Sequence, residues 1–316
     1  MKLSIVTSLY CSAPYVEEFH RRASAAARQL VGEDYEIVMV NDGSPDTAVD
    51  IAIELAKSDP HMVVVDLSRN FGHHRAMMAG LEYSQGERVF ALDVDLEEDP
   101  ELLTLFWRRM EDTHVDHVYG VQQRRKGKWF ERWSGEVFYR LFNWLSYTTI
   151  PRNALMAKLM TRRFVNALLS HKEHNIFLGG LLVLTGFEQE GIPCVKKCKG
   201  STTYTFTRKL KQSIDSITSF SARPLYLIFC LGMGISSLSI VFLGYLLGRK
   251  LIWGDVLAGW TSVMTLISLG FGILTASIGV IGIYLSKIFE EVKHRPYVIV
   301  RDVVRHQSNT HKENNE

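Results

Sequence analysis

Apolar runs alternate with polar turns along the first part of the chain and predict strands separated by helices. Compact apolar runs predict five strands, at Leu3–Leu9, Tyr35–Val40, His61–Leu67, Val89–Leu92 and Val115–Gly120. The intervening segments have turn residues at their starts and predict helices at 14–30, 46–57 and 73–84. Because helices of this length between strands are typical of βαβ units, the pattern predicts an α/β fold with a mostly parallel sheet flanked by helices.

The second half of the chain changes from mixed to strongly apolar. Helices are expected around 162–170 and 175–185, followed by a strand near 190–196. Leu210, Ile214, Ile217 and Phe220 then recur at helical spacing and predict an amphipathic helix on a bilayer surface. Uncharged stretches follow at 225–248 and about 258–286, each long enough to cross roughly 30 Å of hydrocarbon.

Four regions are therefore predicted. They are a cytoplasmic domain at 1–206, a juxtamembrane helix at 207–222, a transmembrane hairpin at 223–288 and a cytoplasmic tail at 289–316. Basic residues are more frequent on both outer flanks of the hairpin than in its connector. They include Lys196 and Lys197 before it and Lys287 after it. The positive-inside bias then places both termini in the cytoplasm of a bacterial inner membrane. From His306 onward the tail is polar and is expected to be disordered.

Polar residues follow four of the predicted strands, at 7–10, 41–46, 68–72 and 93–99. In open parallel sheets, ligands bind beyond the carboxyl ends of the strands. These clusters therefore predict one ligand site at that edge. The chain contains neither a Gly-x-Gly-x-x-Gly fingerprint nor a phosphate-binding P-loop pattern, so the site is of neither type.

Two carboxylates, Asp93 and Asp95, lie at the end of the fourth predicted strand. Side chains alternate along a strand, so both point to the same side and repel one another unless a divalent cation lies between them and a ligand. The alternative is structural, because Glu97, Glu98 and Asp99 are also suited to a helix N-terminus.

A basic and aromatic segment follows at 124–147. Basic side chains bind phosphate, and Trp and Tyr favour membrane interfaces. The alternative is a helix that packs its aromatic face in the core. Both can hold, because one face can pack while the other contacts lipid headgroups.

Charge and cysteine content exclude several classes. The 36 Lys and Arg residues nearly balance 34 Asp and Glu, which argues against a general nucleic-acid-binding protein. Four cysteines in 316 residues do not make a disulfide framework, and the Cys194/Cys198 pair has no second pair nearby for zinc.

These clusters together resemble the polyprenyl-phosphate glycosyltransferases, the dolichol-phosphate-mannose-synthase-like branch of the inverting nucleotide-sugar transferases. The matching motifs are Asn41-Asp42-Gly43-Ser44-Pro45-Asp46, Leu67-Ser68-Arg69-Asn70-Phe71-Gly72-His73, Asp93-Val94-Asp95 with the acidic run after it, and the C-terminal hairpin. The resemblance covers roughly residues 3–290. It implies a GT-A-type domain and a hexosyltransferase activity.

The resemblance also implies roles for particular residues. Tyr10, Asp42, Arg69 and Asp93 would bind the nucleotide of a UDP- or GDP-sugar. Asp95 and Asp93 would act in catalysis and, with Glu97 nearby, hold Mg²⁺ or Mn²⁺. The acceptor would be polyprenyl (undecaprenyl) phosphate from the lipid bilayer, with its phosphate bound by Arg124, Arg125 and Arg132.

The sequence departs from the family pattern at two candidate catalytic segments. A Gly-Asp-Phe-Arg segment of the family aligns with Leu155-Met156-Ala157-Lys158, which has no Asp, and its late Ser-Lys-Tyr aligns with Thr202-Thr203-Tyr204, which has no Lys. Transfer to a phosphate does not require the missing base, because a phosphate monoester with a second pKa near about 6 is already ionised at neutral pH.

Three functional hypotheses follow. The first is an inverting, metal-dependent transfer of one sugar to polyprenyl phosphate. The second is a membrane-anchored transferase with a saccharide or protein acceptor, and the third is a degenerate paralogue without activity. The sequence does not identify the sugar. Glycines in the second apolar stretch are compatible with a homo-oligomer.

Overall fold

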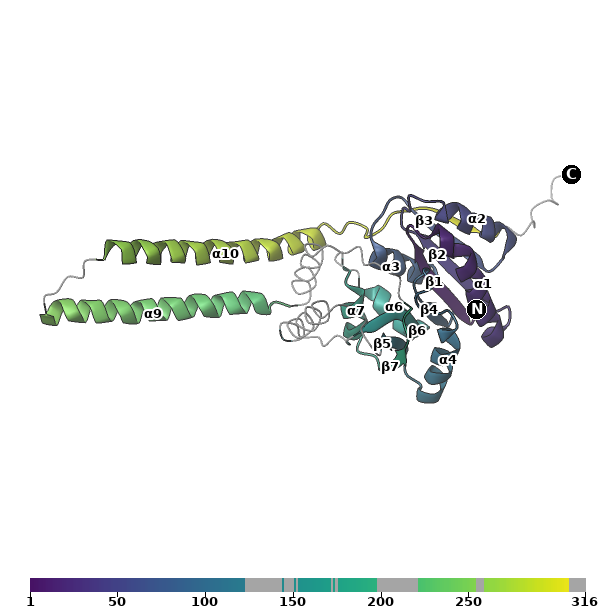
Figure 1. Cartoon of the computed structure of the whole chain (residues 1–316), viewed down its shortest axis with the longest axis horizontal. Coiled ribbons are helices and arrows are strands. Elements are labelled where there is room, and N and C mark those ends of the chain that lie inside the picture. Colours follow the sequence, from purple (N-terminus) through teal and green to yellow (C-terminus); the bar gives the residue numbers. More distant parts are fainter. Residues whose placement is uncertain are drawn as a thin grey trace. The chain divides into compact units, whose positions relative to one another are not determined.

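The computed structural model describes residues 1–122, 144, 151, 153–171, 173, 176–197, 221–253 and 259–306 (Figure 1). They form two compact units. The first comprises the described residues of Met1–Tyr139, Thr149–Tyr204 and Arg295–Glu316, and the second those of Arg140–Thr148 and Thr205–His294. Each unit is described separately.

A mixed sheet forms the centre of the first unit. In the described part of the chain it contains eight strands in the order β7-β5-β6-β4-β1-β2-β3-β8. Their bounds are β1 Leu3–Leu9, β2 Tyr35–Asn41, β3 Met62–Leu67, β4 Arg88–Ala91, β5 His117–Gln122, β6 Ala154–Thr161, β7 Gln189–Cys194 and β8 Val300–Arg305. The pairs β1/β2, β1/β4, β2/β3 and β5/β7 are parallel, whereas β4/β6, β5/β6 and β3/β8 are antiparallel. The predicted α/β fold with a mostly parallel sheet is confirmed.

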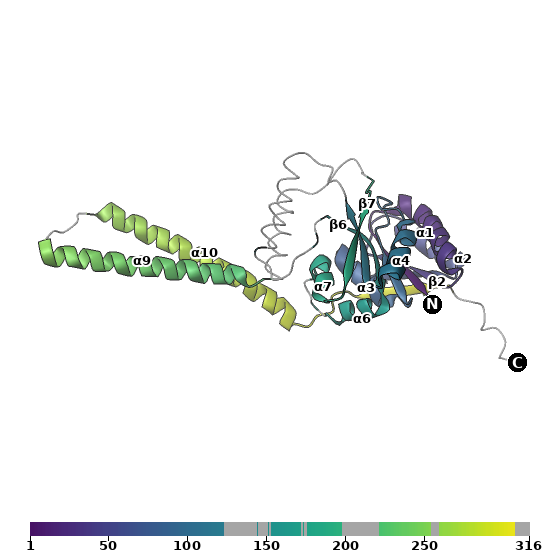
Figure 2. The same ribbon diagram turned by 90° about the horizontal axis from the view of Figure 1, so that it is seen from below.

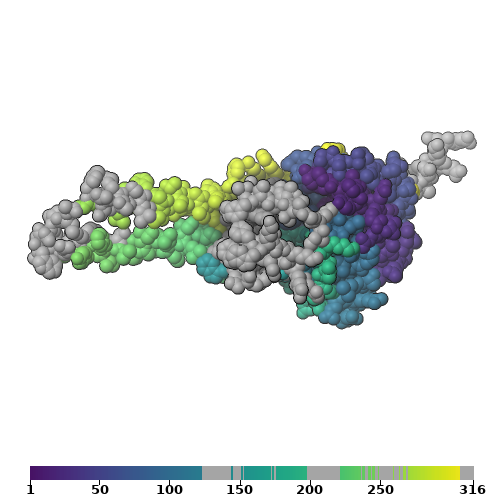
Figure 3. Space-filling view, viewed as in Figure 1, coloured from purple at the N-terminus to yellow at the C-terminus, as the bar shows by residue number. Residues whose placement is uncertain are grey.

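Helices cover both faces of this sheet (Figures 1 and 2). They are a short 3₁₀ turn at Ala13–Tyr15, α1 Val16–Val31, α2 Ala48–Ser58, α3 His73–Tyr83, α4 Leu102–Thr113, α6 Arg162–Ser170 and α7 Leu178–Leu184. On one face, Ile5 of β1 belongs to a core cluster with Phe19 of α1 and Phe106 of α4. On the other face, α3 packs so closely on β1 that a Cβ at Gly80 would lie 2.4 Å from Cγ1 of Val6. The surfaces of α1 and α4 can be followed in the space-filling view (Figure 3).

The second unit contains two long helices, α9 Arg223–Trp253 and α10 Trp260–Val292. Both predicted apolar spans fall largely within them. Among the described residues, one stretch, Gly270–Val292, is long and apolar enough to cross a membrane, and Arg223–Ile235 is a shorter apolar helix. The Tyr284 hydroxyl donates to the carbonyl oxygen of Ser221 at 2.5 Å. Most of the predicted amphipathic helix, 207–220, lies outside the described residues.

Two strands were not predicted. β6 runs through Ala154–Thr161, a segment rich in Ala, Leu and Met, which favour helices. β8 lies within the segment 289–316 that was assigned to a tail, and it pairs with β3 at the edge of the sheet. The first unit therefore extends beyond residue 206 and includes residues that follow both long helices.

Candidate active site

The four predicted polar clusters meet at one edge of the sheet. β4, β1, β2 and β3 are neighbours and run parallel, so their carboxyl ends lie side by side. The amide of Asp42 donates to the carbonyl oxygen of Leu9 at 3.0 Å, and the amide of Cys11 donates to Oγ of Ser44 at 2.8 Å. These bonds join the loop after β1 to the loop after β2.

Asp42 joins the loop after β2 to the loop after β3. Its side chain is buried and accepts the backbone N–H of Phe71 at 2.7 Å and that of Gly72 at 3.0 Å. Burial raises the pKa of this carboxyl group, and the two backbone hydrogen bonds act against that rise. Asn70 returns a bond, since its Nδ2 donates to the Asp42 carbonyl oxygen at 3.0 Å. Asp42 thus fixes the conformation of the loop that carries Arg69.

Close approach of these two loops requires glycine at position 43. Gly43 has φ +59°, and a Cβ there would lie 2.5 Å from the backbone nitrogen of Asn70. Any side chain would therefore push the loops apart. The glycine in the turn Asn41-Asp42-Gly43-Ser44 is thus required by its contact with the loop after β3.

Arg69 and Tyr10 are exposed at the same edge of the sheet. The Arg69 guanidinium lies over the Phe71 ring, 4.1 Å from its centroid, and Nη1 donates to the Asn70 carbonyl oxygen at 3.2 Å. Tyr10 is 54% exposed. A planar cation and an aromatic ring at a ligand-binding edge can contact a nucleotide by stacking and by phosphate pairing.

Asp93 and Asp95 follow β4 in a turn. The Glu97 amide donates to Oδ1 of Asp95 at 3.0 Å, and Leu96 has φ +58°, which is unusual for a leucine. Burial raises the pKa of Asp93 to about 6, and the Asp95 carboxylate adds to this rise. Repulsion by the Asp95 carboxylate is thus part of the cause of the raised Asp93 pKa. The predicted alternation along a strand does not apply to this pair, because β4 ends at Ala91.

His73 contacts both β1 and the acidic turn. Its Nδ1 is 2.9 Å from Oγ of Ser8, and its Nε2 is 3.5 Å from Oδ1 of Asp93. Burial lowers the pKa of His73 to about 4, so the ring is neutral at pH 7. Sequence reasoning did not assign a role to this residue, although it directly follows the Asn-Phe-Gly motif at the start of α3.

Two lysines balance the carboxylates. Lys158 of β6 is buried and donates to the Leu155 carbonyl oxygen at 2.9 Å, and burial lowers its pKa to about 8 although Glu98 and Asp93 oppose this shift. Lys196 lies 3.0 Å from Oε2 of Glu97 and 3.5 Å from Oε1 of Glu98.

The ion pairs of Lys196 and Lys197 add a local contact to the sequence interpretation. Both residues were counted with the basic flank of the membrane hairpin. In the structure Lys196 pairs with Glu97 and Glu98, and Nζ of Lys197 is 2.6 Å from Oδ1 of Asp99. They neutralise the acidic turn, because the end of β7 lies beside it.

Glu98 connects the acidic turn to the segment in which the family Asp is missing. Its buried carboxylate accepts the amide of Met156 at 3.1 Å and that of Ala157 at 2.5 Å. Burial raises the pKa of Glu98, which these bonds oppose. Glu98 therefore has a structural role, but through the amides of β6 and not at a helix N-terminus, since α4 begins only at Leu102.

The predicted metal ligands lie in this turn, with Glu97 already paired to a lysine. Within the described ranges, no group of three or more His, Cys, Asp or Glu residues is arranged to hold a metal ion. Mg²⁺ and Mn²⁺ at diphosphates need only one or two carboxylates, because phosphate and water supply the other oxygens. The Asp93 and Asp95 pair fits that donor set. Arg124, Arg125 and Arg132 lie outside the described residues.

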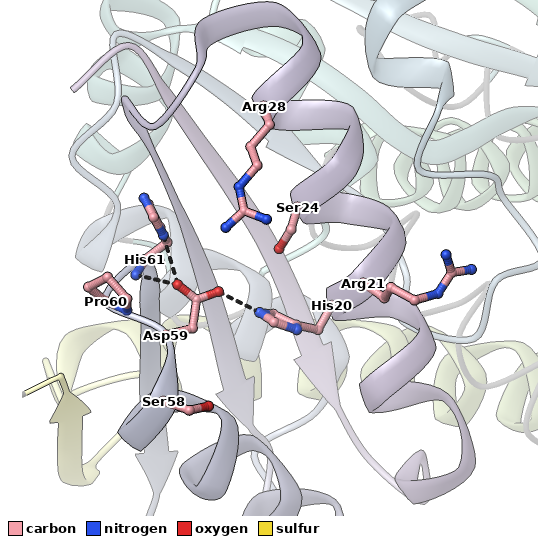
Figure 4. Close-up of a pocket in the computed structure, with 8 residues that line it drawn as sticks. All are labelled: His20, Arg21, Ser24, Arg28, Ser58, Asp59, Pro60 and His61. Atoms are coloured by element: carbon pink, nitrogen blue, oxygen red, sulfur yellow. Dashed lines mark hydrogen bonds and ion pairs between the residues drawn. The ribbon is translucent and has the colours of Figure 1, made fainter.

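A hollow of about 550 Å³ occurs elsewhere, between α1 and the start of β3 (Figure 4). Asp59 lies between His20 and His61, at 2.7 Å from a ring nitrogen of each. Arg21 and Arg28 are paired with Glu18 and Glu33. This hollow lies at the amino end of β3, away from the polar loops. Its charged side chains are paired with one another or with neighbouring carboxylates.

Comparison with known proteins identifies the family of this chain. The sequence model described as glycosyl transferase family 2 matches residues 4–175. A Mycobacterium tuberculosis (strain CDC 1551 / Oshkosh) protein, grouped by its name with the glycosyltransferases, is 45% identical over 303 residues, covering 96% of this chain and 88% of that protein. The bactoprenol glucosyl transferase of Shigella phage SfV is 29% identical over 306 residues, covering 96% of this chain and 99% of that protein.

Among solved structures, mannosyl-3-phosphoglycerate synthase from Rubrobacter xylanophilus superposes with a TM-score of 0.49 at 16% identity, covering 72% of this chain and 74% of that chain. The sheet topology and the family match define a glycosyltransferase with the expected GT-A-type fold. The chain belongs to glycosyl transferase family 2.

Proposed function

We propose that this glycosyltransferase moves a single sugar from a UDP- or GDP-sugar to polyprenyl phosphate on the cytoplasmic face of the membrane, with inversion at the anomeric carbon. The main support is the match to a bactoprenol glucosyl transferase over 96% of this chain. A match of that extent includes α9 and α10, so the shared features are not limited to the nucleotide-sugar domain. The donor site and the long apolar helices are then parts of one function.

The donor nucleotide would bind where the loops after β1, β2 and β3 meet. Arg69 and Tyr10 are exposed there, whereas Asp42 is buried against the Phe71 and Gly72 amides. We assign direct contacts with the nucleotide to Arg69 and Tyr10. Asp42 would act on the nucleotide partly by holding the Arg69 loop in place.

Asp95, with Asp93 beside it, would hold Mg²⁺ or Mn²⁺ at the sugar diphosphate. When bound, such an ion neutralises charge that develops on the leaving diphosphate. The protein keeps these two carboxylates close despite their repulsion, since His73 and the lysines of β6 and the β7 end surround them. Lys158 and Lys196 lower the pKa of Asp93, so they favour its ionised form.

The missing family Asp at Met156 is compatible with this reaction. A lipid phosphate is ionised at neutral pH and needs no general base to attack the anomeric carbon. The protein must then orient donor and acceptor in line, which is a matter of positioning. Arg124, Arg125 and Arg132 stay our proposed contacts for the acceptor phosphate.

The position of β8 supports the hairpin topology. β8 follows α9 and α10 in the chain and pairs with β3 of the N-terminal domain. The two ends of the helical segment must therefore lie on the same side of any membrane that it crosses. An even number of crossings follows, so if Gly270–Val292 spans the bilayer, α9 spans it as well. This supports a multi-pass protein with both ends of the helical segment on one side of the membrane, and the positive-inside bias is our reason for placing that side in the cytoplasm.

A direct transfer assay tests the proposal. Purified full-length protein is incubated with labelled UDP-glucose, undecaprenyl phosphate and Mn²⁺, and label is counted in the organic phase. UDP-glucose is tested first because the viral relative is named a glucosyl transferase, and GDP-mannose and other donors follow. Label in lipid that depends on undecaprenyl phosphate supports the proposal. Transfer to a saccharide or protein alone, with none to lipid from any donor, would reject it.

A further inference from the structure

The strand that follows both long helices borders the loop that carries Arg69. β8 pairs in antiparallel register with β3, with Asp302 opposite Asp66 and Val300 opposite Leu67. The register shifts at this point, so Arg301 is an extra residue between two paired ones. Extra residues of this kind bend the strand and redirect their side chains.

The redirected Arg301 side chain forms hydrogen bonds with two residues just before Arg69. Its Nη1 donates to Oδ2 of Asp66 at 3.1 Å, and its Nη2 donates to the carbonyl oxygen of Ser68 at 2.8 Å. The Ser68 amide in turn donates to the carbonyl oxygen of Ile299 at 2.9 Å. Both backbone polar groups of Ser68 are thus held by residues from beyond α10.

Hydrogen bonds of Asp66 also connect Arg301 to the neighbouring loop after β2. Oδ1 of Asp66 accepts Nδ2 of Asn41 at 2.7 Å, and Oδ1 of Asn41 accepts the amide of Ser44 at 3.0 Å. Asn41 immediately precedes Asp42. One carboxylate therefore links Arg301 to both loops of the proposed nucleotide site.

We propose that Arg301 is a positioning residue for the nucleotide-sugar donor. It holds the chain at Ser68, through which Arg69 is presented to the nucleotide. This inference rests on the proposed function, in which that loop contacts the donor. The Arg301 side chain is 60% exposed, and exposed ion pairs add little to global stability. Loss of the side chain should therefore change the loop without unfolding the domain.

The test compares Arg301→Ala with Arg305→Ala in the full-length protein. Arg305 lies at the other end of β8 and makes no side-chain hydrogen bond or ion pair in the part of the chain that the structure describes. We expect Arg301→Ala to raise the KM for the donor about tenfold through misplacement of the loop, with the KM for undecaprenyl phosphate and the melting temperature unchanged. Arg305→Ala should match the wild type, and Arg301→Lys should recover part of the loss.

Hydrogen exchange supplies a readout that does not depend on activity. The amides of residues 68–72 should exchange faster in Arg301→Ala than in Arg305→Ala, and UDP with Mn²⁺ should protect them less. Equal donor KM values and equal exchange in the two variants would overturn the inference. If the wild type transfers no sugar from any donor, the proposed function fails, and the exchange comparison alone decides the role of Arg301.

Discussion

Nε2 of His73 lies 3.5 Å from Oδ1 of Asp93, while Nδ1 of the same ring lies 2.9 Å from Oγ of Ser8. One neutral imidazole thus spans the gap between the end of β1 and the acidic turn after β4. Because His73 begins α3, the ring is held by both a strand and a helix. It can fix the orientation of Asp93 without adding a charge.

Replacement of His73 by alanine should reduce transfer. Side chains that orient a metal-binding carboxylate typically contribute about 10- to 100-fold to metal affinity or activity. We expect a loss of that size in kcat, together with a higher Mn²⁺ concentration for half-maximal rate. His171→Ala at the end of α6 is the control. Wild-type kinetics in His73→Ala would show that Asp93 needs no such support.

Substitution of Gly43 should damage the donor site more than a matched glycine substitution. Gly43 and Gly32 have similar positive φ values, +59° and +63°, but only at Gly43 would a Cβ meet a neighbouring backbone. Gly32→Ala should cost about 1–3 kcal/mol from backbone strain alone. Gly43→Ala should in addition raise the donor KM about tenfold through displacement of the loops, whereas Gly32→Ala should leave it unchanged.

Urea unfolding and steady-state kinetics on both variants provide the measurement. The informative quantity is the donor KM, because both glycines have positive φ but only Gly43 lies against a neighbouring loop. Equal donor KM values in the two variants would contradict the close approach of the loops after β2 and β3.

The buried His117 should make the domain less stable in mild acid. Burial lowers its pKa to about 3, and its Nδ1 lies 2.9 Å from Oε1 of Gln189. An unfolded histidine titrates near about 6.5. Between these two values the unfolded chain binds the extra proton, so the free energy of unfolding falls as pH falls. The slope from this group is at most about 1.4 kcal/mol per pH unit.

His117→Asn should reduce that slope, because asparagine keeps a hydrogen-bond donor for Gln189 but takes up no proton. Unfolding is followed in urea at several pH values between about 7 and about 5, where the unfolded histidine titrates. The exposed His306 provides the control as His306→Asn. An unchanged slope in His117→Asn would show that His117 is accessible to protons in the folded protein.

The hairpin topology predicts that two reporter fusions lie on opposite sides of the membrane. A fluorescent protein after residue 316 should fold in the cytoplasm and fluoresce. Alkaline phosphatase inserted at 254–258, between α9 and α10, should be active because that connector would lie outside. Phosphatase activity from a C-terminal fusion would contradict the cytoplasmic placement of the C-terminus.

The sequence predicted β1 to β4 and the edge at which they end, since each is an apolar run followed by polar turn residues. It did not predict β6, because Ala154–Thr161 has few β-branched residues and a lysine in its centre. That lysine is stable there only because carbonyl oxygens and the Glu98 and Asp93 carboxylates surround it. Such compensation depends on residues far apart in the chain.

β8 was missed for a related reason. Val300–Arg305 is short and half charged, as edge strands often are, and nothing local indicates its partner. The ion pairs of Lys196 and Lys197 with the acidic turn could not be predicted from the sequence either, since about 100 residues separate the partners along the chain. The motifs indicated the proposed site, whereas its supporting contacts could be seen only in the folded structure.

The transfer of labelled sugar to undecaprenyl phosphate by Asp95→Asn, beside the wild type and the exposed control Asp112→Asn, tests the account most directly. The asparagine can still accept the Glu97 amide, so the turn should persist. We predict Mn²⁺-dependent lipid labelling by the wild type and Asp112→Asn, and a loss of at least about 100-fold in Asp95→Asn. Full lipid labelling by Asp95→Asn, or by EDTA-treated wild type, would contradict the assignment of this turn as the catalytic centre.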